Sequence, residues 1–198
     1  MREIDCRGLA CPQPVLETKE ALEGLSEGEV LRVLVDNEAA VQNVSRFVSS
    51  QGYPLQVREE AGYFILEVVK KGRGRPVEGV SCERPEGIFR VILVDSDRMG
   101  EGDEELGRKL MVNFLQTLPQ VSPLPQALIF YNRGVFLTVE GSPVLSALRE
   151  LEGKGVKILS CWTCLSHYDL EDKLRVGQAS NMYEILSLLM RADRVLRP

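Results

Sequence analysis

A stretch rich in glycine, proline and charge interrupts the hydrophobic patterning of this sequence between Lys70 and Gly87. It reads KKGRGRPVEGVSCERPEG and has neither the period of a helix nor the alternation of a strand. A stretch of this composition is typical of a flexible linker. The sequence therefore predicts two folded units, residues 1–70 and 88–198, joined by a linker over residues 71–87.

The composition and charge of the chain argue against several classes of function. Of its 198 residues, 44% are hydrophobic and 27% are charged, which is ordinary for a globular protein. The net charge of -5 argues against binding nucleic acid through a basic face. The N-terminus lacks the apolar core of a signal peptide, and no apolar run is long enough to cross a bilayer. We therefore expect a cytoplasmic protein that binds neither nucleic acid nor membrane and keeps its five cysteines reduced.

The apolar pattern of the first segment predicts the order strand, helix, strand, helix, strand, strand. Asn37 is expected to be the N-cap of the second helix, and the last two strands form a hairpin. This order predicts a two-layer βαβαββ sandwich. The predicted elements are marked by Ile4, Pro14 to Leu25, Leu31 to Val35, Asn37 to Gly52, Leu55 to Val57, and Phe64 to Val68.

The second segment predicts an α/β domain with a parallel sheet. FRVILVD is continuously apolar, as are strands buried on both faces, and ALIFY and VKIL predict two further strands. Helices are expected around the apolar series Leu106, Leu110, Phe114 and Leu118, after the N-cap Ser142 with Pro143 at the first helical position, and after the N-cap Asn181. RVL near the C-terminus predicts an edge strand. Alternating strands and helices indicate a doubly wound sheet.

Cys11 precedes Pro12 at the start of the first predicted helix. A residue before proline adopts an extended backbone, which makes Cys11 a candidate N-cap, with regular helix from Pro14. Because Pro12 and Pro14 have no N–H, the first turn keeps chiefly the N–H groups of Gln13 and Val15 as donors to a thiolate. The prolines therefore predict a rigid support for Cys11, which is either a reactive thiol or a small buried apolar side chain.

The stretch DCRGLACPQPVLETKEAL resembles the signature D-x-R-G-x-x-C-P-x-P of the TusA-like, or SirA-like, family. The resemblance extends over roughly residues 1–70 and implies a βαβαββ sandwich. It also implies that Cys11 carries sulfur as a persulfide between donor proteins, such as a cysteine desulfurase, and acceptor proteins. Cys6 lies outside the motif, so we expect it to pack inward. The matching residues are Asp5, Arg7, Gly8, Cys11, Pro12 and Pro14.

A second pair of thiols, Cys161 and Cys164, follows the predicted strand VKIL at its carboxyl end, where open α/β sheets bind ligands. The C-x-x-C spacing is compatible with reversible dithiol chemistry, with metal binding, or with two unrelated packed thiols. His167 extends the pattern to C-x-x-C-x-x-H. Structural zinc needs four ligands and Cys82 is the remaining candidate, so we expect no metal.

The segment CWTCLSHYDL resembles the cysteine segment of the DsrE/DsrF-like and YchN-like families. That resemblance implies a flavodoxin-like fold, a place in sulfur relay and homo-oligomers formed through this domain. By spacing, Cys161 matches the single DsrE cysteine, and the C-x-x-C form matches the YchN-like pattern. A TusA-like domain joined to such a domain resembles the YedF proteins, which are called sulfurtransferase-like selenium-metabolism proteins.

The sequence thus predicts a sulfur or selenium carrier without a cofactor, a sulfurtransferase-like protein rather than a self-sufficient enzyme. Cys11 passes a persulfide in this hypothesis, and Cys161 with Cys164 forms a second thiol site, with His167 in a supporting role. Two alternatives stay open from the residues themselves. One is a dithiol redox module that uses Cys161 and Cys164, and the other is a binding or assembly module without chemistry.

Overall fold

The computed structural model describes residues 1–10, 12–60, 62–71 and 87–198. It divides into two compact units, Met1–Arg84 and Pro85–Pro198, each of which is described by itself. The predicted linker, residues 71–87, falls mostly on residues 72–86, which lie outside the described residues. The boundaries 1–70, 71–87 and 88–198 therefore stay a prediction.

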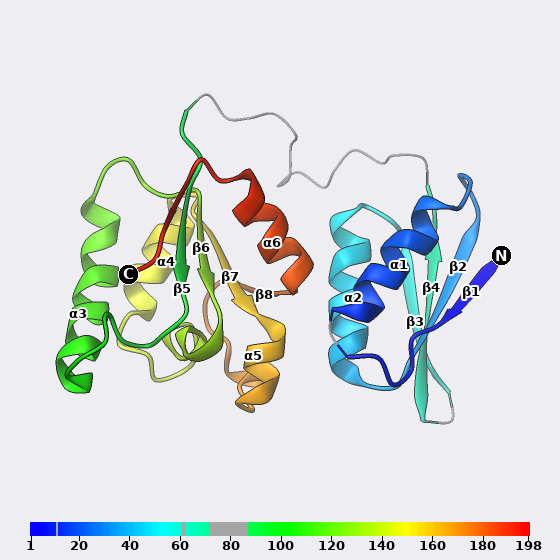
Figure 1. Cartoon of the computed structure of the whole chain (residues 1–198), viewed down its shortest axis with the longest axis horizontal. Coiled ribbons are helices and arrows are strands. Elements are labelled where there is room, and N and C mark those ends of the chain that lie inside the picture. The colour runs from blue at the N-terminus through cyan, green and yellow to red at the C-terminus, as the bar shows by residue number, and fades with distance from the viewer. Residues whose placement is uncertain (11, 61, 72–86) are drawn as a thin grey trace. The chain divides into compact units, whose positions relative to one another are not determined.

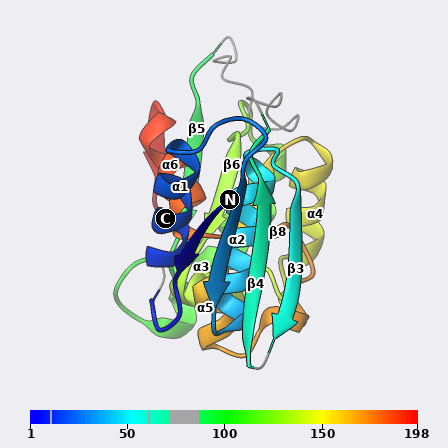
Figure 2. The same cartoon turned by 90° about the vertical axis from the view of Figure 1, so that its right-hand side faces the viewer.

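Two helices cover one face of a four-stranded sheet in the first unit (Figure 1). The sheet order is β1-β2-β4-β3; β1 is parallel to β2, and β4 is antiparallel to both of its neighbours. Figure 2 shows the strands of this sheet in front of α2. The predicted βαβαββ sandwich is confirmed. Its elements are β1 (Arg2–Asp5), α1 (Gln13–Glu23), β2 (Val30–Val35), α2 (Glu38–Ser50), β3 (Leu55–Glu60) and β4 (Tyr63–Val69).

The core of the first unit lies between the sheet and its helices. Leu31, Val33 and Val35 alternate along β2 and are fully buried, because successive strand residues point to opposite faces. On the other face Arg32 pairs with Glu67 of β4, with Nε and Oε1 3.2 Å apart. The alternation read from the sequence thus assigns each face of β2 correctly.

The second unit contains a five-stranded sheet in the order β8-β7-β6-β5-β9, with every strand pair parallel. The predicted parallel α/β domain is confirmed, including its C-terminal edge strand. Figure 1 labels most of its elements. The elements are β5 (Arg90–Val94), α3 (Glu104–Thr117), β6 (Ala127–Phe130), the 3₁₀ helix η2 (Asn132–Leu137), α4 (Leu145–Gly153), β7 (Lys157–Cys161), α5 (Trp162–His167), β8 (Gln178–Ser180), α6 (Met182–Arg191) and β9 (Arg194–Leu196).

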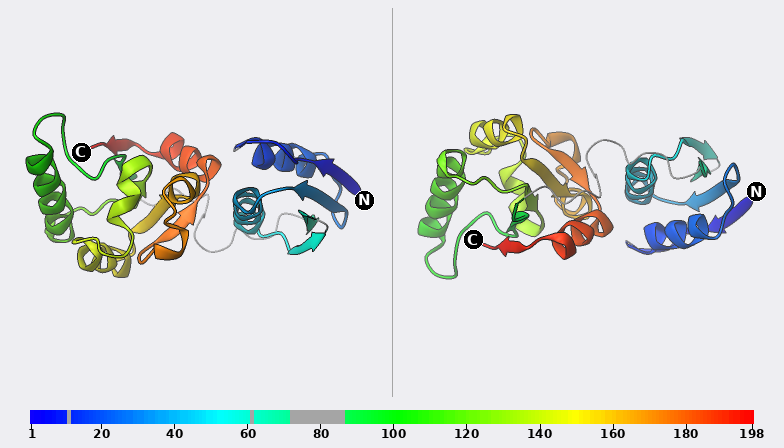
Figure 3. Two further views of the ribbon diagram at one scale, coloured as in Figure 1. Left: turned by 90° about the horizontal axis from the view of Figure 1, so that it is seen from below. Right: turned by 90° about the horizontal axis from the view of Figure 1, so that it is seen from above.

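Helices cover both faces of this sheet (Figure 3). Leu128 and Phe130 of β6 pack in the same apolar cluster as residues of α3 and α4. Ala127 and Ile129 of the same strand pack in a second cluster, which includes residues of α6. All four side chains are buried, so β6 shows the continuous apolar run that a doubly covered parallel strand requires.

The buried face of α3 differs from the predicted one. Leu106 and Leu110 were expected in the apolar face, but they are 54% and 41% exposed. Gly107, Met111 and Leu115 are the buried residues instead. The reason is a close approach of the preceding loop: Met99 N–H donates to the Gly107 carbonyl oxygen at 3.0 Å, where a side chain would crowd the loop.

Two smaller elements also differ from the prediction. Helix α4 begins at Leu145 with Val144 as its N-cap, so Ser142 is not the N-cap and Pro143 precedes the helix. Ser142 Oγ instead accepts from the Val144 N–H at 3.4 Å and stabilises the turn. Strand β8 was not predicted, because three residues are too few to show an alternating pattern.

In the described part of the chain, no helix combines the length and apolar character needed to cross a membrane.

We predict that Gly134→Ala destabilises the second unit by about 1–3 kcal/mol, as overpacking of a tight contact does. A Cβ at this position would lie 2.2 Å from the Val94 carbonyl oxygen, so η2 would have to move away from β5. Thermal or denaturant unfolding measures the change. Gly153→Ala is the matched control, because a Cβ there meets nothing within 4 Å; equal stability loss in both variants would contradict the prediction.

Candidate functional site

The loop between β1 and α1 carries most of the predicted motif of the first unit. Arg7 donates through Nε and Nη2 to the two carboxylate oxygens of Asp5 at 2.9 and 2.6 Å, and its backbone N–H donates to Oδ1 at 3.1 Å. These bonds lower the pKa of Asp5 to about 2. The Arg7 guanidinium also lies over the Tyr63 ring, 5.1 Å from its centroid. Arg7 therefore braces the loop.

Gly8 also holds this loop in place, and its backbone conformation is one that favours glycine. Its φ is 74°, in the left-handed region, and its N–H donates to Asp36 Oδ2 at 2.7 Å. Asp36 follows β2, so the bond ties the loop after β1 to the end of the neighbouring strand. The glycine of the motif is thus required by the shape of the loop.

The first helix begins one residue earlier than predicted. Pro12 occupies the N-cap position of α1, and Gln13 is already helical, so neither an N-cap at Cys11 nor a helix start at Pro14 holds. The fixed φ of proline suits the start of a helix, which explains Pro14 within the first turn. Cys11 itself lies outside the described residues.

The first-turn donors that were expected to face a thiolate bond to the backbone instead. Gln13 N–H donates to the Ala10 carbonyl at 2.9 Å, and Val15 N–H donates to the Pro12 carbonyl at 3.0 Å. Because these N–H groups already have partners, the start of α1 offers little stabilisation to an anion. The other thiol of this loop, Cys6, is 1% exposed, and burial raises its pKa to about 11.

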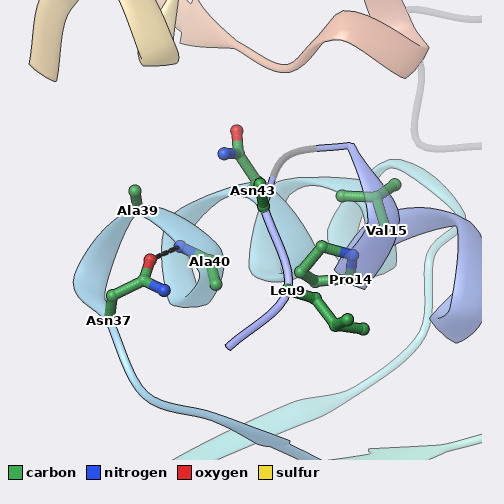
Figure 4. Close-up of a pocket in the computed structure, with 8 residues that line it drawn as sticks. Leu9, Pro14, Val15, Asn37, Ala39, Ala40 and Asn43 are labelled. Atoms are coloured by element: carbon green, nitrogen blue, oxygen red, sulfur yellow. Dashed lines mark hydrogen bonds between the residues drawn. The ribbon is translucent and has the colours of Figure 1, made fainter. Parts of the chain in front are cut away.

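A small, largely apolar pocket of about 90 Å³ lies beside this helix start. Figure 4 shows Leu9 and Pro14 on one side and Ala39 and Ala40 of α2 on the other. Asn37 caps α2 by accepting from the Ala40 N–H at 2.8 Å, drawn as a dashed line. The pocket is lined by Leu9, Ala10, Pro14, Val15, Asn37, Ala39, Ala40 and Asn43.

In the second unit, Cys161 ends β7 and is 2% exposed. It packs with Leu159 and with Ile185 and Leu188 of α6 in an apolar cluster. Cys164 lies one turn further along, in α5, and is half-buried. The two thiols therefore differ in exposure, which the C-x-x-C spacing does not indicate.

Backbone and thiol donors converge on Cys164. The Asn132 N–H donates to Cys164 Sγ at 3.0 Å, and the Cys161 thiol hydrogen-bonds to the same sulfur. These bonds stabilise the Cys164 thiolate and lower its pKa to about 7, even though partial burial opposes the change. The pKa of Cys161 is raised, because its S–H is held by Cys164 and because the thiol is buried. Cys164 is therefore the thiol that ionises near neutral pH.

The donor Asn132 was not singled out in the sequence. Its φ is 48°, and the Tyr168 hydroxyl donates to its side-chain Oδ1 at 3.1 Å, which holds the turn in place. Gly134 packs against β5 in the same turn. The sequence does contain a feature that points to Asn132. It follows a buried strand and shortly precedes Gly134, at the edge of the sheet where Cys161 lies.

Charged groups surround the carboxyl ends of β5 and β6. Tyr131 donates its hydroxyl to Asp95 at 3.4 Å, and Arg197 forms an ion pair with the same carboxylate. Arg133 binds both oxygens of Asp97, at 2.9 and 3.0 Å. These cations are neutralised by their own carboxylates, so they do not supply the charge that lowers the pKa of Cys164.

His167 does not join the thiols. It is exposed at the last position of α5, and its ring contacts the Tyr168 ring with centroids 4.9 Å apart. Within residues 1–10, 12–60, 62–71 and 87–198, no three of the His, Cys, Asp and Glu side chains are grouped to hold a metal ion. Cys82, the expected fourth zinc ligand, lies outside these residues.

Comparison with known proteins identifies the first unit. Residues 2–70 match the family described as Sulfurtransferase TusA. A putative sulfur carrier protein from Methanocaldococcus jannaschii is 44% identical over 71 residues, which cover 36% of this chain and 95% of that protein. The chain belongs to the TusA family of sulfur carriers. The sulfur carrier protein TusA of Allochromatium vinosum is 36% identical over 70 residues, which cover 35% of this chain and 92% of that protein.

Two solved structures resemble the two units. A SirA-like protein from Desulfitobacterium hafniense has a TM-score of 0.34 and 35% identity, and covers 36% of this chain and 100% of its own. The ychN protein from E. coli has a TM-score of 0.44 and 16% identity, and covers 56% of this chain and 100% of its own. The TusA match concerns residues 2–70, so the thiols of the second unit rest on their own geometry.

We predict that Cys164 reacts with iodoacetamide with a midpoint near pH 7, because its pKa is about 7. The thiolate reacts, so the rate falls as the pH drops below that value. Cys161→Ala removes one donor and moves the midpoint up toward about 8.5, the value of a free thiol. The pH dependence of labelling, followed peptide by peptide with mass spectrometry, measures both.

Tyr168→Phe serves as a milder control for the same measurement. It removes the bond to Asn132 Oδ1 but keeps both donors to Cys164, so its midpoint should lie between those of the parent and Cys161→Ala. Preferential labelling of Cys161 over Cys164 in the folded protein would contradict the assignment.

Proposed function

We propose that this chain carries sulfur as a persulfide on Cys11, received from a donor protein and passed to an acceptor. The observation that carries the proposal is the match of residues 2–70 to the TusA family, over nearly the whole length of a sulfur carrier relative. The motif D-x-R-G-x-x-C-P-x-P is complete in this chain. Members of a sulfur carrier family interact with sulfur donors and acceptors in general.

The proposed transfer is an exchange between sulfur atoms. The Cys11 thiolate attacks the outer sulfur of a donor persulfide, a new S–S bond forms, and the donor bond breaks to leave the donor thiolate. The outer sulfur moves to Cys11 without an external oxidant or reductant. The acceptor thiolate then repeats the same exchange on the Cys11 persulfide.

The loop before α1 supports this role through its rigidity. The bond from the Gly8 N–H to Asp36 and the Asp5–Arg7 pair hold the chain on the N-terminal side of Cys11. The N–H groups of Gln13 and Val15 already donate to backbone carbonyls, so they do not hold a thiolate strongly. A carrier needs a thiol that is held in place but whose thiolate is not strongly stabilised, because a strongly stabilised thiolate would be a poor nucleophile.

We propose Cys161 and Cys164 as a second thiol site that receives sulfur from Cys11 or from another persulfide. The contact between the two thiols also favours a second candidate function, a dithiol redox module. The same proposal includes a cysteine desulfurase as the donor and selenium as an alternative cargo. It also includes a relationship to the YedF proteins, a cytoplasmic location and homo-oligomers formed by the second unit. The sequence resemblances described above support all of these except the location, which is expected from the sequence pattern of the chain.

We predict that incubation with a cysteine desulfurase and cysteine adds one sulfur atom to the peptide that contains Cys11. Mass spectrometry of alkylated peptides measures the addition. Cys11→Ala should abolish it, whereas Cys6→Ala should keep it, because Cys6 is buried and its pKa is raised to about 11. Loading of Cys6 with Cys11 unmodified would overturn the proposal.

A pair of glycine variants tests the role of the braced loop. Gly8→Ala and Gly62→Ala both place alanine at a positive φ, 74° and 88°, with open space around the new Cβ. Each should cost about 1 kcal/mol of stability. We expect Gly8→Ala to slow loading of Cys11 by about tenfold, through misplacement of the thiol, and Gly62→Ala to leave the rate unchanged. Equal rates in the two variants would argue against a role for the loop in transfer.

A further inference from the structure

The two thiols of the second unit are arranged so that one meets an incoming sulfur and the other lies behind it. Cys164 is half-buried on α5, whereas Cys161 is 2% exposed at the end of β7. Cys161 packs under α6 with Ile185 and Leu188. A persulfide presented by another protein or a small thiol can therefore reach Cys164, while Cys161 is shielded.

The N-cap position alone would predict that Cys161, rather than Cys164, is the thiol stabilised as an anion. Cys161 occupies the N-cap position of α5, where the helix end favours an anion. Its burial at the end of a doubly covered strand outweighs that advantage. Cys164 is stabilised as a thiolate first by the Cys161 thiol and then by the Asn132 N–H, which donates to its Sγ at 3.0 Å.

The contact between the thiols points to a second step. Cys161 lies in the apolar cluster against which Cys164 packs, and it is the N-cap of the helix that carries Cys164, so its thiol lies beside the reacting atom. Cysteines three residues apart at the start of a helix are neighbours on one side of it. Cys161 is thus placed to attack Cys164 once that sulfur carries a second sulfur atom.

We propose that Cys164 accepts sulfur as a persulfide and that Cys161 resolves it, releasing hydrosulfide and leaving a Cys161–Cys164 disulfide. This inference rests on the proposed function only for the identity of the physiological sulfur donor. It assigns to the second unit an activity beyond carriage: reductive release of the sulfur that the first unit is proposed to carry.

The step balances within the protein. Cys161 sulfur attacks Cys164 sulfur, the bond between Cys164 and the outer sulfur breaks, and its electron pair leaves with the outer sulfur. The proton of the Cys161 thiol goes to that sulfur, so Cys164–S–S⁻ and Cys161–SH become the disulfide and HS⁻. The two cysteines are the reductant, and a dithiol reductant returns the pair for another round.

Loading also prepares Cys161 for its step. In the resting pair, the bond to Cys164 and the negative charge of that thiolate raise the pKa of Cys161. When Cys164 bears a second sulfur, the charge moves outward to that atom. Cys161 is then less strongly held as a thiol, so resolution follows loading and does not precede it.

The test uses the full chain with Cys11→Ala and Cys82→Ser, so that sulfur chemistry at these two cysteines is removed. The reduced protein receives glutathione persulfide, whose own transfer leaves glutathione and no sulfide. We expect the parent to release one hydrosulfide per chain and to form the Cys161–Cys164 disulfide. A sulfide assay and mass spectrometry of the peptide that contains both cysteines measure the two products.

Two single variants separate the steps. Cys161→Ser keeps a hydrogen-bond donor and nearly the same volume but cannot form the disulfide, so it should retain the added sulfur on Cys164 and release no more sulfide than the blank. Cys164→Ser should neither gain sulfur nor release sulfide. Circular dichroism and thermal unfolding confirm that both variants are folded.

Three outcomes would overturn the inference. They are sulfide release by Cys161→Ser at the parental level, addition of sulfur to Cys161 in Cys164→Ser, and a stable persulfide on Cys164 of the parent without disulfide. Because Cys11 is absent from every protein in this experiment, its result is independent of the desulfurase test. Loss of Cys11 loading there, with sulfide release intact here, would reject the carrier proposal alone.

Discussion

Helices on both faces of the parallel sheet bury β7 along its length, and the difference between the two thiols of the second unit depends on that burial. Cys161 ends this strand, so its side chain belongs to the apolar cluster under α6. Cys164 lies one turn further along the chain, and its side chain is only partly buried against this cluster. A one-turn step along the chain thus separates a shielded thiol from one that ionises near neutral pH.

A second contact, between the 3₁₀ helix η2 and strand β5, positions the donor that Cys164 needs. Gly134 lies against the Val94 carbonyl so closely that a Cβ would be 2.2 Å from it. This approach brings the turn after β6 back over the end of β5, and Tyr168 holds Asn132 within that turn. The N–H of Asn132 then donates to the sulfur of Cys164 in helix α5. The Cys161 thiol at the start of α5 and the Asn132 N–H from the turn after β6 together lower the pKa of the Cys164 thiol.

The first unit uses its backbone donors differently. The N–H group of Gly8 in the loop before α1 and those of Gln13 and Val15 in the first turn of α1 donate to acceptors of the protein, which are Asp36, Ala10 and Pro12 in that order. The loop is therefore rigid without being a strong anion site. In the second unit, the N–H of Asn132 and the S–H of Cys161 donate to Cys164. The first arrangement suits reversible carriage of sulfur, and the second suits a site that captures it.

The sequence by itself determined the order of elements in the first unit and the order of the longer strands and helices in the second, because alternation and helical spacing follow from burial of one or two faces. It also identified the TusA motif and the C-x-x-C pair, since these are local strings of residues. It missed the short strand β8, and it assigned Leu106 and Leu110 to the buried face of α3, because the Met99 loop that displaces them approaches from outside the helix. Only the tertiary structure decided which thiol of the pair is shielded and which ionises more readily. The burial of Cys161 and the donor Asn132 come from α6 and from the turn after β6, which are distant in sequence from the motif.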